Sequence, residues 1–462
     1  MHNFGVSISS LCQLTDTVKN VAGLLNTFFR RPHMNNLSIC QKIIKGISEL
    51  ISSSVFLDSF RLGKHFTRRR KIDMRQIIIY LFYHSRNSMD LNIAGIRDDL
   101  PKLNFPAVSK QALSKARTGI SPALFRHLFH FSVHSFYNSC AGRKDWHGYF
   151  PFAIDGSRIQ VPTTKDNLSY FGRCRNGSHS REDAMASISI LYDVCNDIVV
   201  DGVIHDFNHG ERSSAMEHLL FLEENSLTDR ALILCDRGYP SYELFSHIQQ
   251  QGYFFLMRVQ KNIPSLINTG KEDAVIDYVP DHLRKKGKPP VRVRVLHIML
   301  EGGSEEWLVS NLVDLSLTPE DFSSLYFKRW KVEGKYREFK SQLEIERFHG
   351  ARHECVEQEF YLWLLFSNLC ALLKSDADAV IEKHTARSGN STRYQADRAY
   401  LIGRLKKKLP VLLLEPASIF DRLRELLEEA SKKRSQVQPN RKCKRPRIQL
   451  RYRYLNNRKS CI

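Results

Sequence analysis

The sequence predicts an α/β protein in which a mixed β-sheet with flanking helices is preceded and followed by helical segments. Apolar residues recur at three- and four-residue spacing up to about residue 145, strand-like apolar runs begin near residue 150, and helical and strand patterns then alternate. We expect a helical N-terminal domain (1–145), a sheet domain (146–375) with a β-rich insertion at about 260–312, C-terminal helices (376–430) and a basic, disordered tail (431–462).

Two helices of the N-terminal region have clear start signals. Ser121 followed by Pro122 opens one helix, because serine caps the first turn and proline fits the first helical position. The short basic segment 107–119 has Ser109 as its cap and ends at a glycine. It fits the recognition helix of a helix-turn-helix, although a surface helix of a bundle is the commoner use of such a segment. The basic run Thr67–Lys71 fits either a phosphate contact or a solvated surface.

The sheet is predicted from apolar runs separated by turn residues. Gly156 and Ser157 indicate a turn between the first two strands, and Asn196 with Asp197 indicates a hairpin between the next two. The expected order is strands at 151–155, 158–161, 185–194 and 197–205, a helix at 211–222, a strand at 231–236, a helix at 241–250 and a strand at 253–259.

A different pattern begins at residue 260. The insertion contains a basic, proline-flanked loop and an alternating strand at 291–299. A long helix is expected after it, because Thr318 provides a cap, Pro319 occupies the first turn and two acidic residues follow. This helix can extend to about Gln342, and apolar helices follow it.

The charge balance indicates a polyanionic partner. The 462 residues include 69 Lys and Arg against 49 Asp and Glu, which gives a formal net charge of +20. Such an excess attracts nucleic acid or an anionic membrane surface. No apolar run approaches the roughly 20 residues that span a bilayer, and the start of the chain lacks a signal-peptide pattern. The ten cysteines include no C-x-x-C pair, so we expect neither a zinc site nor a disulfide framework, and we predict a soluble, cytoplasmic protein.

Two aspartates end predicted strands. Asp155 closes the first apolar run and Asp236 closes the run ALILC. Acidic residues at such positions lie at the edge of a sheet, where a metal ion can be reached. Taken singly, each aspartate also fits a turn or a helix cap.

A polar stripe follows on the predicted long helix. Arg329, Glu333 and Lys340 are offset by three, seven and fourteen residues from Tyr326. At about 100° per residue these offsets place all four side chains within about 60° of one another. The stripe fits a functional site, and it also fits a solvated face with incidental ion pairs.

The spacing Y-x2-R-x3-E-x6-K, present here as YFKRWKVEGKYREFK, resembles the signature of the Insertion Sequence Four family of DDE transposases. The contexts of the two aspartates, AIDGSRI and CDRGY, resemble those of the family's first two acids. The resemblance extends over about residues 145–375. It implies a ribonuclease-H-like fold, with the first acid on the first strand, the second after the fourth strand and the third on the helix after the fifth.

The resemblance also implies the chemistry. Asp155, Asp236 and Glu333 would be the catalytic residues and would hold two Mg²⁺ ions, with Mn²⁺ as a substitute. One ion would activate an attacking water or DNA 3′-hydroxyl, and the other would stabilise the leaving oxygen. No protein nucleophile is required.

The other signature residues are expected to bind DNA. By resemblance, Arg329 and Lys340 contact phosphates near the transposon end, and Tyr326 contacts the backbone there. In family members that form a hairpin on the element end, a tryptophan of the insertion stacks on a flipped base. Trp307 is the natural counterpart, although a core tryptophan of a strand is an equally good reading.

The family implies a DNA transposase that moves an insertion sequence by cut and paste. Its partners would be terminal inverted repeats and target DNA, bound by a homodimer at the nucleoid of a bacterium, with the N-terminal domain on the element end. A nuclease of the same fold leaves the polar stripe unexplained, and a catalytically inactive DNA-binding protein is opposed by the complete set of acids. No phosphate-binding loop of an ATPase is present, and nothing in the sequence indicates a Ser/His/Asp triad.

Overall fold

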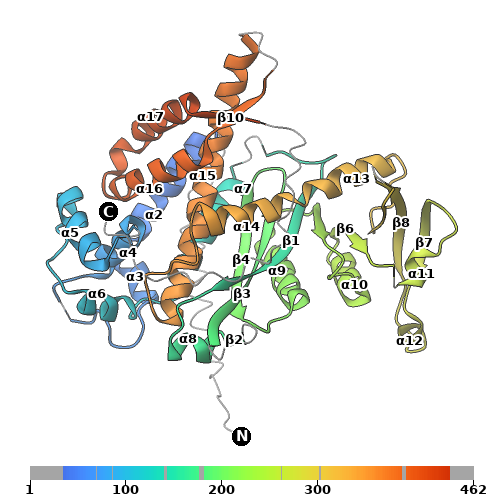
Figure 1. Cartoon of the computed structure of the whole chain (residues 1–462), viewed down its shortest axis with the longest axis horizontal. Helices are drawn as coiled ribbons and strands as arrows, with labels where there is room; N and C mark the ends of the chain where they lie inside the picture. Colours follow the sequence, from blue (N-terminus) through green and yellow to red (C-terminus); the bar gives the residue numbers. More distant parts are fainter. Residues whose placement is uncertain are drawn as a thin grey trace, which may run out of the picture.

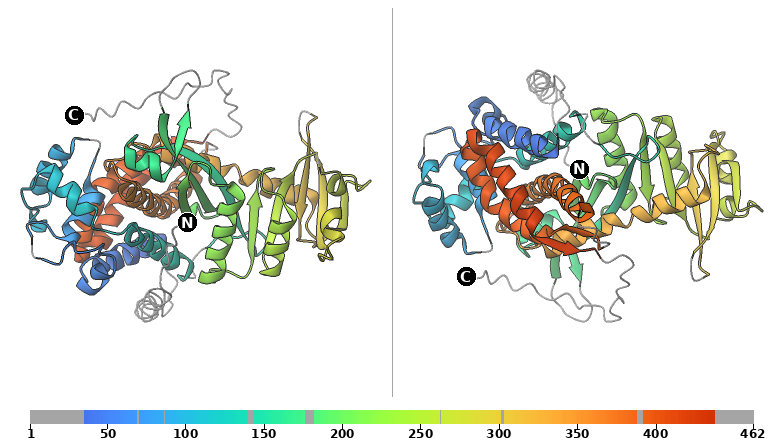
Figure 2. Two further views of the ribbon diagram at one scale, coloured as in Figure 1. Left: turned by 90° about the horizontal axis from the view of Figure 1, so that it is seen from below. Right: turned by 90° about the horizontal axis from the view of Figure 1, so that it is seen from above.

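The computed structural model describes residues 35–437, apart from residues 69, 86, 140–142, 176–181, 262, 301–302 and 388–391. Helices gather at one side of the molecule, and a sheet with its own helices extends to the other (Figure 1). The long helix α15 (His353–Arg387) lies between the other helices of the helical part and the sheet (Figure 2). The predictions for residues 1–34 fall outside the described residues.

Within the described residues, the main sheet has nine strands and is mixed. β3 pairs antiparallel with β1 and with β4, whereas β1, β5 and β6 are parallel neighbours. The order β4-β3-β1-β5-β6 is the ribonuclease-H-like arrangement, so the predicted fold class is confirmed. The strands are β1 (Phe150–Gln160), β2 (Arg173–Arg175), β3 (Glu182–Asp193), β4 (Ile198–Asp206), β5 (Ala231–Cys235), β6 (Phe254–Val259), β7 (Asp273–Tyr278), β8 (Val291–Met299) and β9 (Glu305–Ser310).

Helices connect the parallel strands, as parallel pairing requires. α9 crosses from β4 to β5 and α10 crosses from β5 to β6, which confirms the predicted alternation. The helices of this part are α8 (Lys165–Tyr170), α9 (Glu211–Asn225), α10 (Tyr242–Gln250), α11 (Pro264–Ile267), α12 (Asp281–Arg284), α13 (Pro319–Lys328) and α14 (Lys331–Ser341).

The first strand corrects one prediction. The expected turn at Gly156 and Ser157 is absent, because β1 runs straight through both residues. Gly156 pairs with Ser189 and Ser157 with Ile188, so the long partner β3 keeps the Gly-Ser pair in the sheet. The predicted hairpin between β3 and β4 is confirmed, and Asp197 in its turn has a positive φ of 60°.

The β-rich insertion extends the main sheet. β9 pairs antiparallel with β6, and β8 and β7 follow outward, so the sheet continues in the order β6-β9-β8-β7. In Figure 1 these strands form the end of the molecule opposite the helical part.

The predicted helix caps are present. Ser121 accepts a hydrogen bond from the backbone N–H of Ala123, and Ser109 accepts one from Ala112. Thr318 forms a capping box with Asp321, in which each side chain accepts from the other residue's backbone N–H. These bonds satisfy N–H groups that have no partner inside the helix.

The helical part combines segments from both ends of the chain. α7 and α2 pack against α15 together with α17, and α4 packs against α16. Its helices are α2 (Asn36–Leu50), α3 (Ser54–Ser59), α4 (Met74–Tyr83), α5 (Met89–Asp99), α6 (Lys110–Arg117), α7 (Pro122–Tyr137), α15, α16 (Arg398–Leu414) and α17 (Ile419–Lys432), with short 3₁₀ turns at Pro101–Leu103 and Pro416–Ser418. None of the described helices is long and apolar enough to cross a membrane.

The expected disordered tail is corrected at its beginning. α17 continues to Lys432, and β11 (Arg434–Gln436) pairs antiparallel with β10 (Tyr394–Ala396). Residues 438–462 lie outside the described residues.

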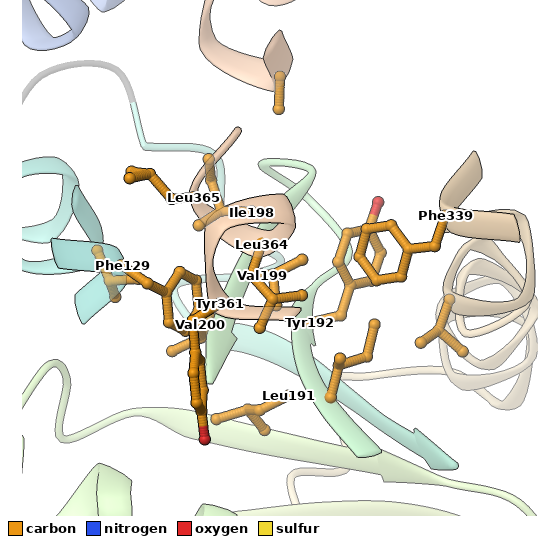
Figure 3. Packing of buried hydrophobic residues seen from close by; sticks show 14 of the residues in the cluster. Phe129, Leu191, Tyr192, Ile198, Val199, Val200, Phe339, Tyr361, Leu364 and Leu365 are labelled. Carbon is orange, nitrogen blue, oxygen red and sulfur yellow. The ribbon is translucent and has the colours of Figure 1, made fainter. Parts of the chain in front are cut away.

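The core joins α15 to the free side of β4. Figure 3 shows Leu364 and Leu365 of α15 beside Ile198, Val199 and Val200. A side chain at Gly202 would meet Leu364 at 2.4 Å, so the glycine allows the helix to approach the strand closely. Asn368 of α15 accepts a hydrogen bond from the N–H of Val199 and donates one to its carbonyl, each at 2.8 Å, and so covers a strand edge that would otherwise be exposed.

Candidate active site

Asp155 and Asp236 lie at corresponding positions of two neighbouring parallel strands. Ala153 of β1 is opposite Leu234 of β5, and the same register carried two residues further brings Asp155 beside Asp236. Neighbouring strands lie about 4.8 Å apart, and residues two apart point to the same face. The two carboxylates predicted from strand ends are therefore brought together at one edge of the sheet.

The backbone of Asp155 is held from two directions. Its carbonyl oxygen accepts a hydrogen bond from the hydroxyl of Tyr336 at 2.6 Å and one from the hydroxyl of Ser189 at 3.1 Å. Burial raises the pKa of Asp155 to about 6, although the guanidinium of Arg329 acts to lower it. The negative charge of Glu333 adds to the rise. For Asp155, the cost of burying the ionised carboxylate thus outweighs the stabilisation that Arg329 provides.

Asp236 has closer partners. Its Oδ1 accepts a hydrogen bond from the Tyr326 hydroxyl at 3.2 Å and lies 3.2 Å from Nε of Arg258 on β6. Burial acts to raise the pKa of Asp236, but the N–H of Arg237 and the charge of Arg329 lower it below its usual value. Tyr326 is almost fully buried, so in this structure its hydroxyl serves the carboxylate.

The helix that carries the third acid is divided. The sequence predicts one helix from Thr318 to about Gln342, whereas the structure has α13 and α14 with Arg329 and Trp330 between them. The N–H of Arg329 bonds to the carbonyl of Tyr326, a tighter i to i+3 turn, so the two helices remain nearly continuous. Figure 1 shows them leading from the insertion to the sheet.

Arg329 is the centre of the carboxylate group. Its side chain is only 2% exposed, and Nη2 lies 3.6 Å from Oε1 of Glu333. Asp155, Asp236 and Glu333 all act to raise the pKa of the guanidinium, which stays above its usual value despite the opposing effect of burial. The three predicted acids therefore surround one buried positive charge, and Glu333 and Asp236 keep about a third of their side chains exposed, 38% and 34%.

An ionic network that begins at Lys335 holds α14 in place. Lys335, two residues after Glu333, places its ammonium 2.7 Å from Oδ1 of Asp197 and 3.2 Å from Oε2 of Glu338. Arg398 of α16 pairs with the same two acids. The network fixes the helix of the third acid to the β3–β4 turn and to the helical part.

The two remaining predicted residues, Lys340 and Trp307, make their contacts with residues other than the three acids. Lys340 donates to the hydroxyl of Ser157 at 2.9 Å and to the carbonyl of Arg158 at 2.7 Å, near the end of β1. Trp307 lies on β9, stacked on the ring of His297 with centroids 4.4 Å apart, and the ammonium of Lys261 lies 4.9 Å from the ring centroid. Trp307 is partly buried and lines a hollow of about 770 Å³ that also includes Arg258, the partner of Asp236.

Three features of the site were not predicted from the sequence. Arg258 bridges Asp236 and Glu306, Tyr336 holds Asp155, and Glu211 acts electrostatically on Asp155. Arg258 and Tyr336 lie inside regular elements and give no local signal. Glu211 is the first residue of a predicted helix that follows a strand after a short loop, and that position is the only signal that could have identified it.

A buried Ser/His/Asp group is formed by residues of β3, β4 and α9. Nδ1 of His218 is 2.8 Å from Oδ2 of Asp201, and Nε2 is 3.0 Å from the Ser189 hydroxyl. All three side chains are at most 3% exposed, so a substrate has no access to them. His130 of α7 also bonds to Asp201, at 2.9 Å, which makes the group a link between the helical part and β1.

Two histidines that lie near Glu354 in the sequence, His349 and His353, form ion pairs and hydrogen bonds within the fold. His349 is 3.6 Å from Glu359, whose carboxylate pairs with Arg117 at 2.8 Å. His353, at the start of α15, bonds to Asp166 through its backbone N–H and its ring. Each carboxylate already has a donor or a cation, so these groups stabilise the fold.

Comparisons with known proteins found similarity to transposases. A family model described as the transposase DDE domain matches residues 146–369, a range that includes all three acids. The transposase InsG for insertion sequence element IS4 of Escherichia coli strain K12 is 23% identical over 310 residues, which are 65% of this chain and 65% of that protein. The matched part thus spans slightly less than two thirds of InsG.

Two further similarities were found. The putative transposase InsZ of the same strain is 25% identical over 212 residues, which are 44% of this chain and 68% of that protein. Among solved structures, the cryo-EM structure of the piggyBac transposase synaptic complex with hairpin DNA has a TM-score of 0.44 at 12% identity, and the alignment covers 88% of this chain and 87% of that chain.

Proposed function

Because this chain belongs to the DDE transposases of the Insertion Sequence Four family, we propose that it cuts DNA at the terminal inverted repeats of an insertion sequence and joins the ends to target DNA. The observation that carries the proposal is the convergence of Asp155, Asp236 and Glu333 on Arg329. Acids from β1, from the end of β5 and from α14 meet at one edge of the sheet, where a DNA strand can approach.

The three carboxylates fit a divalent metal centre. They are hard oxygen donors, they converge, and the raised pKa of Asp155 indicates that its charge needs a nearby cation. We propose two Mg²⁺ ions, with Mn²⁺ as a substitute. When bound, such ions lower the pKa of an attacking water or 3′-hydroxyl and stabilise the leaving oxygen.

The residues around the acids would keep the carboxylates in fixed positions during the reaction. Tyr336 and Ser189 hold the backbone of Asp155, and Tyr326 and Arg258 hold the carboxylate of Asp236. Rigid placement is useful because phosphoryl transfer depends on alignment of the attacking and leaving oxygens.

A basic groove in the helical part is the proposed contact to the element end. It lies between α6 and the described residues of the loop at 64–72, and it has a volume of about 920 Å³. None of the described residues that line it is acidic. Its cationic residues are Lys64, Arg68, Arg70, Lys71 and Lys115. Such a groove suits the phosphates of a duplex, and the exposed side of α6 would then lie against the bases.

Lys340 and Trp307 are proposed to guide the strand beside the acids. Lys340 lies at the exposed end of β1, where its ammonium can exchange carbonyl partners for a phosphate. Trp307 lines the hollow next to Arg258, which supports a role in stacking on an unpaired base. Two copies of the chain would bring the two ends together.

Cleavage of the element's own end tests the proposal. Duplexes that carry the DNA flanking the gene for this chain would be incubated with Mg²⁺ or with EDTA. We expect nicking at the end of the repeat with Mg²⁺ only, and its loss in Glu333→Gln while binding of the duplex persists. The matched control is Asp281→Asn, an acid of α12 that is 89% exposed and lies in the insertion.

The outcomes separate the functions. Nicking that depends on Mg²⁺ and Glu333 supports the transposase, and appearance of strand-transfer products extends it to joining. Equal binding without cleavage by wild type and variant would instead favour a DNA-binding protein without catalysis.

A further inference from the structure

Glu211 directs its carboxylate between the two chain segments that carry the aspartates. It is the first residue of α9, after the loop that leaves β4. A methyl group at Gly156, the residue after Asp155, would stand 3.6 Å from Oε1 of Glu211. A methyl group at Gly238, two residues after Asp236, would stand 3.5 Å from Oε2. The two oxygens therefore face both segments at close range.

The fold, and not the side chain alone, fixes this position. Arg212, the neighbour of Glu211, donates from Nε to the carbonyl of Gly238 at 3.2 Å and from Nη2 to the carbonyl of Pro240 at 3.3 Å. The first turn of α9 is thereby tied to the loop that follows Asp236. A movement of the first turn of α9 away from the site would have to break these bonds.

Glu211 has no stabilising side-chain partner in the described part of the chain. No hydrogen bond or ion pair reaches its carboxylate there, and the side chain is exposed, so both oxygens are open to a ligand from solvent. A glutamate in the first turn of a helix interacts favourably with the helix dipole. That interaction explains a negative charge at this end of α9, but it does not explain why the carboxylate is directed toward the segments of Asp155 and Asp236.

We propose that Glu211 supplies a fourth carboxylate to the divalent-cation centre of Asp155, Asp236 and Glu333. The inference rests on the proposed function, because it takes these three acids as metal ligands. Mg²⁺ and Mn²⁺ prefer six oxygen ligands, so two ions leave positions that three acids do not fill. α9 thereby joins β1, β5 and α14 as an element that supplies a ligand.

Binding of Mn²⁺ to the DNA-free, full-length protein tests the inference without any activity measurement. Affinities would be measured by isothermal calorimetry and by the electron paramagnetic resonance signal of free Mn²⁺. We expect Asp155→Asn and Glu211→Gln each to weaken Mn²⁺ binding by about tenfold or more. Glu224→Gln, which removes an exposed charge from the other end of α9, should bind Mn²⁺ like wild type.

The outcomes distinguish the inference from the proposed function. If Asp155→Asn weakens Mn²⁺ binding and Glu211→Gln does not, Glu211 is not a ligand and the three-acid centre stands. If wild type binds no Mn²⁺, or binds it independently of Asp155, the proposed centre itself is wrong. Glu211→Asp covers the case in which Glu211→Gln does not fold, because it keeps the charge at the helix start and withdraws only the oxygens. Wild-type affinity in Glu211→Asp would overturn the inference, and reduced affinity at unchanged stability would support it.

Discussion

Nε2 of His218 lies 3.0 Å from the hydroxyl of Ser189, and this hydroxyl donates to the carbonyl of Asp155. A continuous chain of hydrogen bonds therefore runs from His130 in the helical part, through Asp201 and His218, to the strand of the first acid. Buried polar groups that are fully connected in this way make a core rigid. Their loss should affect both stability and the site.

Asp201→Asn should destabilise the protein by about 3–5 kcal/mol, because the amide cannot replace a buried charge that pairs with two histidines. Urea denaturation followed by circular dichroism measures the change. The control is Asp206→Asn, an exposed acid at the end of the same strand, for which we expect less than about 1 kcal/mol. Equal effects of the two variants would show that the network contributes little.

Asp155→Asn should stabilise the metal-free protein at high pH. The folded-state pKa of about 6 is above the ordinary value of 3.8, so the fold favours the neutral carboxyl. Its stabilising contribution is fully present below pH 3.8 and is lost as the pH rises through about 6. In EDTA at pH 8, the variant should therefore gain on the order of 2–3 kcal/mol, a few degrees in Tm.

Thermal melts of both proteins in EDTA across pH 4–8 provide the measurement. The gain in Tm should disappear near pH 4, where Asp155 itself is mostly neutral. A difference that does not change with pH would mean that desolvation of this carboxylate is not its cause.

Arg329→Met should make the protein more dependent on divalent cations. The variant removes the buried positive charge among three carboxylates, so their repulsion is left to a bound ion. We expect a lower Tm in EDTA than for wild type and a larger rise in Tm on addition of Mg²⁺. If Arg329 acted only as a phosphate contact, the Mg²⁺-dependent rise would equal that of wild type and only the affinity for DNA would fall.

Arg68→Ala and Lys71→Ala should each weaken DNA binding in a salt-dependent manner. If each side chain in the basic groove neutralises one phosphate, its removal lowers the slope of log K against log salt by about one. Fluorescence anisotropy of a labelled duplex at several salt concentrations measures this slope. Lys45→Ala, an exposed lysine of α2 outside the groove, should leave it unchanged.

Local patterns in the sequence predict much of the fold but only part of the site. Caps such as Ser121 and Thr318 depend on neighbouring residues, and so they can be recognised from the sequence. The continuity of β1 through Gly156 depends on pairing with β3, and the signature helix divides at Arg329 and Trp330 without a proline or glycine at either position. Neither the course of β1 nor the division of the helix is therefore indicated by the neighbouring residues in the sequence.

The same distinction applies to the acids. Asp155 and Asp236 end apolar runs and Glu333 belongs to a spaced signature, so each has a pattern that can be found. Glu211 reaches the site only because β4 and α9 bring it back beside Gly156 of β1. A residue whose position follows from topology cannot be found by scanning the chain.

The insertion of β7, β8 and β9 between the second and third acids also sets an order of assembly during synthesis. Domains tend to fold as the chain emerges, N-terminal segments first. The strands of Asp155 and Asp236 can pair early, but Glu333 is made only after the whole insertion, and α15, on which α2 and α7 pack, comes later still. A chain that is still shorter than this lacks the third carboxylate and three helices of the helical part, α15, α16 and α17. On the proposed mechanism, a ribosome-bound fragment that ends before Glu333 would therefore be unable to cut DNA.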